Sequence, residues 1–533
     1  MSLFSWFSKP NETIETVANV ENDETITTVS ENVENVETVA TVENVENVLT
    51  ENGALAHKLG ACLNFFACCN RTVDKNTLIQ MFCDAWNENP KIAMKILWNL
   101  RDVHSKGEKS LSITLFSFIK KRLPNTYALC LPIIPEHGCW KDIIKLMCED
   151  VDGLNYNFEQ ISPEIDLICN QISHDLVAYD REPPESVSLC SKWLPAENSK
   201  NEKERKIAKI LASEFYMRNI FSVGVCQPNR EYRKLRSSLN ERIRIVETML
   251  SQKQIENVLY EELPAKALKK YTRAFKTRDG DRYEEFLDSV KSGKVSVKTT
   301  GIHVHELFRT VKSNYSEIVE LQFQEILKKF EDSDIKNVLP VIDVSGSMAG
   351  EPMDVAIGLG AVCSMLCSGS FQNKFITFSE DPQLQTVDPT NLKTIIDSIS
   401  HAGFGFNTNF VKVFDLVLQE AIKSEKQNLP EKIIVFTDMQ FDSANNDVQS
   451  PFEEIKTMYK NFELVPPKFV FWNLRGVPAF PTDGNSNDAT YLSGYSQELL
   501  RFVTESVTPT ELMNEIIDRY EPYVSSTDIN TRL

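Results

Sequence analysis

Hydrophobic and polar positions alternate in two different ways along this chain. Between about residues 55 and 335, apolar residues recur at the three- and four-residue spacing of amphipathic helices, as in 91–103 and 315–330. Turn signals rich in Pro, Gly and Asn divide this region into segments of normal helix length. The pattern predicts an all-α region built from stacked helical hairpins, as in solenoid or HEAT-like proteins.

The pattern changes after Lys336. Short apolar runs typical of buried strands alternate with amphipathic helical segments through the rest of the chain. The alternation predicts a doubly wound, Rossmann-like α/β domain over residues 336–533, with a mostly parallel sheet and helices on both faces. In such domains ligands bind at the carboxyl ends of the strands.

Residues 1–54 follow neither pattern. Val recurs at every third position between 33 and 48, a spacing that fits neither a helix nor a strand for long. Residues 1–51 hold eleven acidic residues and one lysine. We expect a disordered, acidic, low-complexity tail; the alternative is a short helix that forms on a partner.

Charge and cysteine content narrow the class of protein. The net charge is −19, yet residues 199–298 hold 23 Lys and Arg against 14 Asp and Glu, so one basic segment stands in an acidic chain. The 12 cysteines form no paired framework, and we find no secretory signal or apolar run of transmembrane length. We expect a reducing, cytoplasmic compartment, which for a viral protein is the host cytoplasm, and no membrane partner.

One stretch, "NVLPVIDVSGSMAG" at residues 337–350, ends a buried strand in polar side chains. Asp343, Ser345 and Ser347 follow at every second position, so a tight loop can direct them toward one point. Thr408 in "HAGFGFNTNF" and Asp438 in "KIIVFTDMQFD" lie in two further loops at predicted strand ends. Carboxylates and hydroxyls are hard oxygen ligands suited to Mg²⁺, Mn²⁺ or Ca²⁺.

These three loops resemble those of von Willebrand factor type A domains, whose DxSxS motif matches "DVSGSM". In that family the five residues form a metal-ion-dependent adhesion site. The resemblance implies that Ser345, Ser347 and Thr408 bind the metal directly, that Asp343 and Asp438 act largely through water, and that an acidic group of a partner completes the coordination. Met439 departs from the family, which has glycine there. The structural alternative is that the serines cap the next helix and that Asp438 closes a turn.

The helical region has resemblances of its own. Stretches such as "LWNLRDVHSKGEKSL" and "PIIPEHGCWKDIIKL" resemble an uncharacterised family of plants, fungi and large DNA viruses, which joins such a region to a type A domain. The order also resembles the architecture of the Ro autoantigen (TROVE) family, in which a type A domain closes a helical-repeat ring that binds RNA. The second resemblance implies structured or single-stranded RNA as a partner.

Basic residues in the segment 199–298 are the candidates for phosphate contacts. They are Arg230, Arg233, Lys234, Arg236, Lys269, Lys270, Arg273 and Lys276. Tyr232, Tyr271 and Phe275 lie among them and would stack on unpaired bases if they are exposed. The alternative is that the basic residues form an ordinary solvated helix face and that the aromatic residues belong to the core.

Catalytic motifs are not found. The chain has no P-loop, no dinucleotide fingerprint after a strand and no GxSxG nucleophile elbow. The sequence therefore favours a non-enzymatic binding or scaffold protein that uses a divalent metal to engage an acidic partner. RNA binding by the basic helical surface is the first alternative, and metal-dependent hydrolysis is the second.

Overall fold

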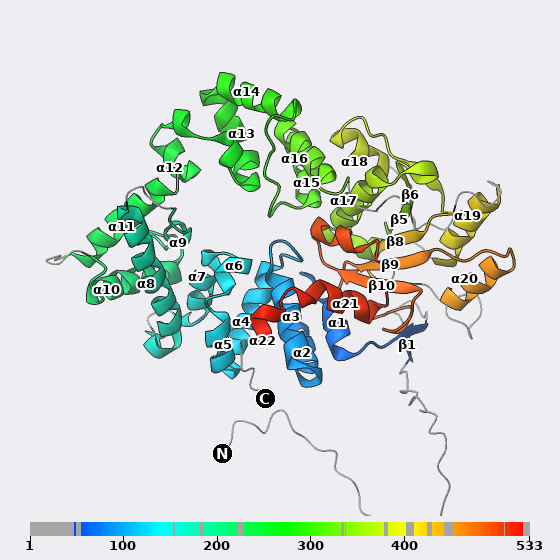
Figure 1. Cartoon of the computed structure of the whole chain (residues 1–533), viewed down its shortest axis with the longest axis horizontal. Coiled ribbons are helices and arrows are strands. Elements are labelled where there is room, and N and C mark those ends of the chain that lie inside the picture. The colour runs from blue at the N-terminus through cyan, green and yellow to red at the C-terminus, as the bar shows by residue number, and fades with distance from the viewer. Residues whose placement is uncertain are drawn as a thin grey trace, which may run out of the picture.

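The structure is a computed structural model, and it describes residues 47–49, 55–152, 155–181, 186–221, 227–331, 335, 337–377, 382–400, 410–423, 429–441, 451–505 and 507–525. It confirms the predicted fold class, with an all-α region followed by a mostly parallel α/β domain (Figure 1). None of the helices in the described part of the chain has the length and hydropathy needed to span a bilayer.

The helical region is a succession of helices joined by short connections. Its helices are α1 (Ala61–Cys68), α2 (Lys75–Glu88), α3 (Pro90–Arg101), α4 (Lys109–Arg122), α5 (Pro124–Cys130), α6 (Ile134–His137), α7 (Trp140–Glu149), α8 (Phe158–Asp180), α9 (Cys190–Trp193), α10 (Glu202–Met217), α11 (Pro228–Arg242), α12 (Val246–Ser251), α13 (Ala265–Arg278), α14 (Gly280–Lys291), α15 (Val304–Asn314) and α16 (Glu317–Lys328).

The junction between α2 and α3 shows how the sequence divides these helices. Asn89 ends α2 in an extended conformation, and its side chain accepts hydrogen bonds from the backbone N–H groups of Lys91 and Ile92. Pro90 then occupies the first position of α3, where a missing N–H costs nothing. Successive helices consequently turn back on one another, and both Trp86 of α2 and Trp98 of α3 are buried.

The α/β domain is built on a six-stranded sheet with the order β10-β9-β8-β5-β6-β7, in which β7 is the antiparallel edge. Its strands are β5 (Val338–Ile342), β6 (Lys374–Thr377), β7 (Leu384–Thr386), β8 (Lys432–Thr437), β9 (Lys468–Asn473) and β10 (Ala489–Ser493). Its helices are α17 (Glu351–Leu366), α18 (Leu392–Ser400), α19 (Phe410–Lys423), α20 (Pro451–Lys460), α21 (Pro509–Asp518) and α22 (Glu521–Ser525).

Helices cover both faces of this sheet. Gly360 of α17 packs on the face that carries Ile342 and Phe436; a Cβ at Gly360 would lie 2.5 Å from Cδ1 of Ile342. Phe469 of β9 points to the other face, where its ring centroid lies 4.6 Å from that of Phe414 in α19. The central strands β5 and β8 are therefore buried on both sides, as their continuous apolar sequences predict.

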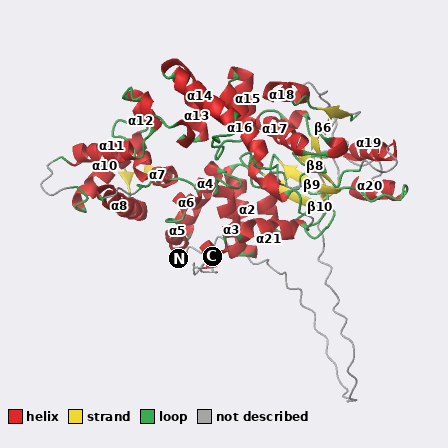
Figure 2. Ribbon diagram, turned by 45° about the horizontal axis from the view of Figure 1, so that its top comes forward, coloured by secondary structure: helices red, strands yellow, loops and turns green. Residues whose placement is uncertain are grey.

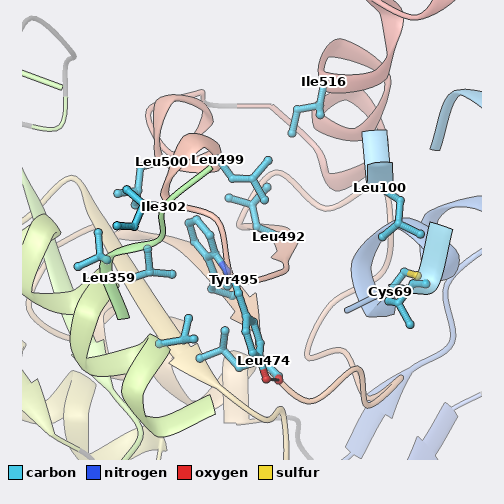
Figure 3. Packing of buried hydrophobic residues seen from close by; sticks show 14 of the residues in the cluster. Cys69, Leu100, Ile302, Leu359, Leu474, Leu492, Tyr495, Leu499, Leu500 and Ile516 are labelled. Carbon is cyan, nitrogen blue, oxygen red and sulfur yellow. Dashed lines mark hydrogen bonds between the residues drawn. The ribbon is translucent and has the colours of Figure 1, made fainter. Parts of the chain in front are cut away.

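Both ends of the helical region pack against the α/β domain, so the chain closes into a ring (Figures 1 and 2). At one end, α1 contacts β10 and α21, while α3 contacts α21 and α22. At the other end, α15 packs on α17 and α18. Figure 3 shows part of the junction: Tyr495 lies between Ile302, which precedes α15, and the α1–α3 side, represented by Cys69 and Leu100.

A small strand pair precedes the ring. β1 (Asn47–Leu49) pairs antiparallel with β2 (Leu55–His57), and the backbone N–H of His57 donates to the carbonyl of Phe480. β1 lies inside the segment 1–54 that the sequence predicts as a disordered tail, so these three residues depart from that prediction. The reason is that Val48 and Leu49 find partners in Ala56 and Leu55 across a hairpin. The other residues of 1–54 lie outside the described part of the chain. A second short pair, β3 (Val151–Asp152) and β4 (Asn155–Tyr156), follows α7.

Candidate functional site

Asp343 stands where the central strand β5 leaves the sheet. Its backbone N–H donates to the carbonyl of Phe436 at 3.0 Å and so continues the pairing between β5 and β8. Its Oδ1 accepts from the backbone N–H of Ser345 at 3.0 Å, and its Oδ2 accepts from Oγ1 of Thr437 at 2.8 Å. These bonds lock a fully buried carboxylate between the ends of two neighbouring strands.

The two serines of the same loop bring their hydroxyl groups together. Ser345 Oγ and Ser347 Oγ lie 3.0 Å apart, at the start of the short 3₁₀ helix η3 (Gly346–Met348). Ser345 is 7% exposed, whereas Ser347 is exposed. Neither side chain caps η3 or α17. The alternative that these serines serve as helix caps is therefore not what the geometry shows.

Asp438 adds a second buried carboxylate from the end of β8. It is 2% exposed, and its Oδ1 accepts from the backbone N–H of Gln440 at 3.1 Å. Burial raises the pKa of Asp343 to about 6, and the negative charge of Asp438 adds to this rise, while hydrogen bonds from Ser345 and Thr437 oppose it. Among the described residues, neither carboxylate forms an ion pair with Lys, Arg or His.

Met439 adopts the backbone conformation that glycine would give this loop. Its φ is +69°, in the left-handed region, and its side chain is fully buried. Its N–H donates to Oγ1 of Thr437 at 3.1 Å. A non-glycine residue in this region costs about 1 to 3 kcal/mol. The departure from the type A pattern is thus accommodated by local strain, and the loop keeps its turn.

Four of the five predicted metal ligands can be placed. Asp343, Ser345 and Ser347 share one loop, and Asp438 ends the adjacent strand. Thr408 lies outside the described residues, so its part in the site stays a prediction. Thr437 is not among the residues predicted from sequence, although its hydroxyl donates to Oδ2 of Asp343. Its position immediately before Asp438 at the strand end is the signal that indicates it.

The residues at this sheet edge fit a hard divalent cation by the chemistry of their donors. Two buried carboxylates of like charge and two hydroxyl oxygens converge, and a cation there would offset the repulsion. Within the described residues, no group of three or more His, Cys, Asp or Glu side chains is arranged to hold a metal. Any cation at this edge would therefore depend on the serine hydroxyls as well as on the carboxylates.

Two of the four candidate RNA contacts on α11 form ion pairs with nearby glutamates. Arg233 Nη1 lies 3.3 Å from Glu197 Oε2, and Lys234 Nζ lies 2.8 Å from Glu231 Oε1. Arg230 is exposed, while Arg236 is half-buried. This helix presents a basic surface that is partly neutralised by its own acidic neighbours.

The candidates on α13 lie elsewhere along the ring, because α12 and a connecting segment separate the two helices (Figure 1). Lys270, Arg273 and Lys276 are exposed. Lys269 is half-buried, burial lowers its pKa, and its Nζ donates to the carbonyl of Glu306 at 3.4 Å. The predicted basic residues therefore form two separate patches.

The aromatic residues of the basic segment belong mostly to the core. Tyr232 is 1% exposed, and its hydroxyl donates to the carbonyl of Pro195 at 2.9 Å. Phe275 is fully buried against Tyr260. Tyr271 is half-buried. Base stacking by Tyr232 or Phe275 is thereby excluded, because the apolar face of each helix uses them for packing.

Comparison with known proteins gives a family but no activity. A family described as "Domain of unknown function (DUF2828)" matches residues 50–164 and 165–343, and "Domain of unknown function (DUF7788)" matches residues 337–525. Among solved structures, the crystal structure of the Deinococcus radiodurans RO (RSR) protein is similar, with a TM-score of 0.42 and 12% identity over 82% of this chain and 92% of that chain. A likeness of that degree supports no statement on function.

A relative by sequence extends over nearly the whole length of both chains. "Uncharacterized protein L728" of Acanthamoeba polyphaga mimivirus is 32% identical over 511 residues, which are 89% of this chain and 87% of the relative. Both the helical ring and the α/β domain therefore fall within the shared length. The chain belongs to the DUF2828 family and has a relative in a giant virus.

Proposed function

We propose that this protein is a non-enzymatic binding protein with a site for one hard divalent cation at the carboxyl ends of the central strands β5 and β8. The cation would be Mg²⁺, or else Mn²⁺ or Ca²⁺, and would engage an acidic group of a partner protein. The observation that carries the proposal is the pair Asp343 and Asp438. Two buried carboxylates repel each other electrostatically without a basic partner among the described residues, and the hydroxyls of Ser345 and Ser347 lie in the same loop as Asp343. A buried pair of like charges is costly unless a cation neutralises it.

The roles proposed for the residues are those that the resemblance to type A domains implies. Ser345 and Ser347 present hydroxyl oxygens that would bind the ion directly, with Thr408 as the proposed third hydroxyl. Asp343 and Asp438 would act mainly through ordered water, since Asp343 already accepts two hydrogen bonds within the protein. Ser347 is the exposed member, so the open coordination position would lie on the solvent side, where a carboxylate of a partner can reach it.

Titration calorimetry of the full chain with MgCl₂, MnCl₂ and CaCl₂ tests the metal site. We expect saturable uptake by the wild type and none by the double variant Ser345→Ala, Ser347→Ala. Ser313→Ala, which removes an exposed hydroxyl from α15, is the matched control and should bind as the wild type does. No uptake of Mg²⁺, Mn²⁺ or Ca²⁺ by the wild type, or equal uptake by the double variant, would contradict the proposal.

The partner's acidic group needs a separate measurement. An immobilised polyglutamate peptide is a suitable probe, because it offers many carboxylates and no fold of its own. We expect it to retain the wild type in Mg²⁺, to release it on addition of chelator, and not to retain the double variant. Retention that survives the chelator would point to a surface other than the metal site.

RNA binding is a second candidate function. The observation that favours it is the exposure of Arg230, Arg233, Lys270, Arg273 and Lys276 on two helices of a closed ring. Phosphate contacts of this kind give an affinity that falls steeply with salt.

The variant Arg230→Glu, Arg233→Glu, Lys234→Glu tests this candidate and avoids the half-buried Arg236. We expect weaker binding of a single-stranded RNA and a shallower dependence of affinity on salt. Charge reversal at the exposed residues Lys75, Lys91 and Lys121, outside the basic segment, is the control. An equal loss in both variants would show a general charge effect and exclude a specific surface.

A further inference from the structure

A cavity of about 490 Å³ lies between α9 and α13, beside the segment that joins α11 to α13. Its wall is aliphatic, with Ile245, Met249 and Leu263 among the residues that form it. Its volume is in the range of sites for small ligands. Five basic side chains line it, from four separate parts of the chain: Lys192, Arg244, Lys266, Lys270 and Lys298.

The positive charge of this cavity is not balanced. Glu247 and Glu262 are the acidic residues in its lining. Lys266 is paired with Glu306 at 3.0 Å, and Nζ of Lys298 donates to the backbone carbonyl of Glu262 at 2.7 Å. Among the described residues, no carboxylate forms an ion pair with Lys192, Arg244, Lys270 or Lys298. The ammonium groups of Lys192 and Lys270 lie over the neighbouring rings of Trp193 and Tyr271, which do not neutralise their charge.

A second cavity of about 500 Å³ adjoins the first and shares five lining residues with it: Arg244, Ile245, Met249, Asn257 and Leu259. Its lining adds Gln252 and Gln254 to the shared Asn257, and these three amides are exposed. The other residues that it adds are Asn240, Glu241, Thr248 and Glu256. Amides offer both donors and acceptors, which is what the edges of nucleic-acid bases require. Arg244, at φ +55° in the turn before α12, reaches both cavities.

We propose that the two cavities form one nucleotide-binding site, with phosphate groups on the cations of the first cavity and a base against the amides of the second. Charge selects the phosphate, and the adjoining amide surface selects a nucleotide over a simple phosphate ion. A free nucleotide and an unpaired nucleotide of an RNA strand share this chemistry. The site is separate from the sheet edge and does not depend on a metal there.

The position of the cavity gives a bound ligand a structural effect. Lys192 belongs to α9, which packs with α7, α8 and α11, whereas Lys270 belongs to α13, which packs with α14 and α16. Phosphates that contact both lysines would join two groups of helices that the segment 243–264 connects along the chain. Ligand binding should therefore raise the melting temperature of the whole protein.

Isothermal titration of the full chain with ATP, with tripolyphosphate, and with a single-stranded RNA of about ten nucleotides, all in EDTA, tests the site. The variant Lys270→Glu, Lys298→Glu should lose about tenfold or more in affinity. The control variant Lys75→Glu, Lys91→Glu has the same charge change on exposed residues outside the cavity lining and outside the candidate RNA surface, and should stay within about twofold of the wild type. A separate variant, Arg273→Glu with Lys276→Glu, reverses two candidates of the RNA surface that do not line the cavity, so failure of that surface and failure of the cavity are distinguishable.

Binding of ATP alone assigns the site to free nucleotides, and binding of the RNA alone assigns it to nucleic acid; either result supports the proposal. Gln252→Leu with Gln254→Leu should remove the preference for ATP over tripolyphosphate. The proposal is overturned if the wild type binds neither nucleotide nor RNA, if tripolyphosphate binds as well as ATP, or if the control variant loses as much affinity as the cavity variant.

Discussion

Arg71 Nη1 lies 3.1 Å from Glu351 Oε1, an ion pair between residues 280 positions apart that joins the start of the ring to the first residue of α17. The same carboxylate oxygen accepts from Nη1 of Arg309 in α15, also at 3.1 Å. Both ends of the helical ring therefore meet the α/β domain at Glu351. This residue closely follows the loop of Ser345 and Ser347, so ring closure and the candidate metal site share one short segment.

Glu351→Gln should weaken ring closure, because it removes the charge that both arginines contact. We expect the free energy of unfolding, measured in urea, to fall by about 1 kcal/mol, since the side chain is 33% exposed and solvent screens its pairs. The loss should be largest at low salt.

Hydrogen exchange should report that α15 becomes more accessible in this variant. Glu317→Gln is the matched control, because Glu317 has the same side-chain exposure but pairs with Lys291 inside the helical region. Two results would argue against a special role for the junction. One is a loss of stability in Glu317→Gln as large as in Glu351→Gln, and the other is a loss in Glu351→Gln that does not depend on salt concentration.

Lys106 should make stability rise with pH. Its Nζ is fully buried and donates to the carbonyls of Phe66 and Cys69 and to Oγ of Ser493. Burial lowers its pKa from 10.5 to about 8. Because the unfolded chain holds this proton more tightly, the penalty of the buried charge is fully present below pH 8 and is relieved between about pH 8 and pH 10.5.

Thermal unfolding between about pH 7 and pH 9 provides the measurement. The wild type should gain about 1 kcal/mol over that interval relative to Lys106→Met, which has no proton to lose. Lys75→Met, at an exposed position, should follow the wild-type profile. Parallel profiles for the wild type and Lys106→Met would show that this lysine stays charged throughout.

At position 439, the Gly variant should be more stable than the Ala variant, which is the reverse of the usual order. Met439→Ala and Met439→Gly both remove a buried side chain, but only glycine is relaxed at φ +69°. We expect Met439→Gly to be more stable than Met439→Ala by about 1 kcal/mol in urea unfolding. At Met458 in α20 the order should be the ordinary one, with Gly less stable than Ala by about 1 kcal/mol. The same order at both positions would contradict the strained turn.

The strand ends were predictable from sequence because the determinants are local. The apolar run that ends at Ile342, and the polar residues that follow it, place Asp343 at a sheet edge whatever the rest of the fold. The equivalent pattern places Asp438 at the end of β8. Parallel pairing of β5 with β8 then brings the two carboxylates to one edge.

Closure of the ring and the exposure of aromatic residues were not predictable in the same way. No local pattern links Arg71 to Glu351, because their contact depends on the summed geometry of all the helices between them. Helical spacing also cannot distinguish a core aromatic such as Tyr232 from one on the surface. In α11, basic residues and buried apolar residues follow one another within a single turn, so the sequence does not show which face Tyr232 belongs to. The cationic cavity likewise arises from residues that only the folded ring brings together.

Asp343→Asn should separate the stability of the metal-free protein from its capacity to bind metal. In EDTA the substitution removes the repulsion between two buried carboxylates, so we expect a higher melting temperature than that of the wild type. With Mg²⁺ at about 100 times its dissociation constant, the wild type should gain about 2.7 kcal/mol and the variant little. Asp388→Asn, at an exposed carboxylate of the same domain, should change neither quantity. Scanning calorimetry decides: a variant that is less stable in EDTA and still stabilised by Mg²⁺ would mean that the cation, if bound, is held elsewhere.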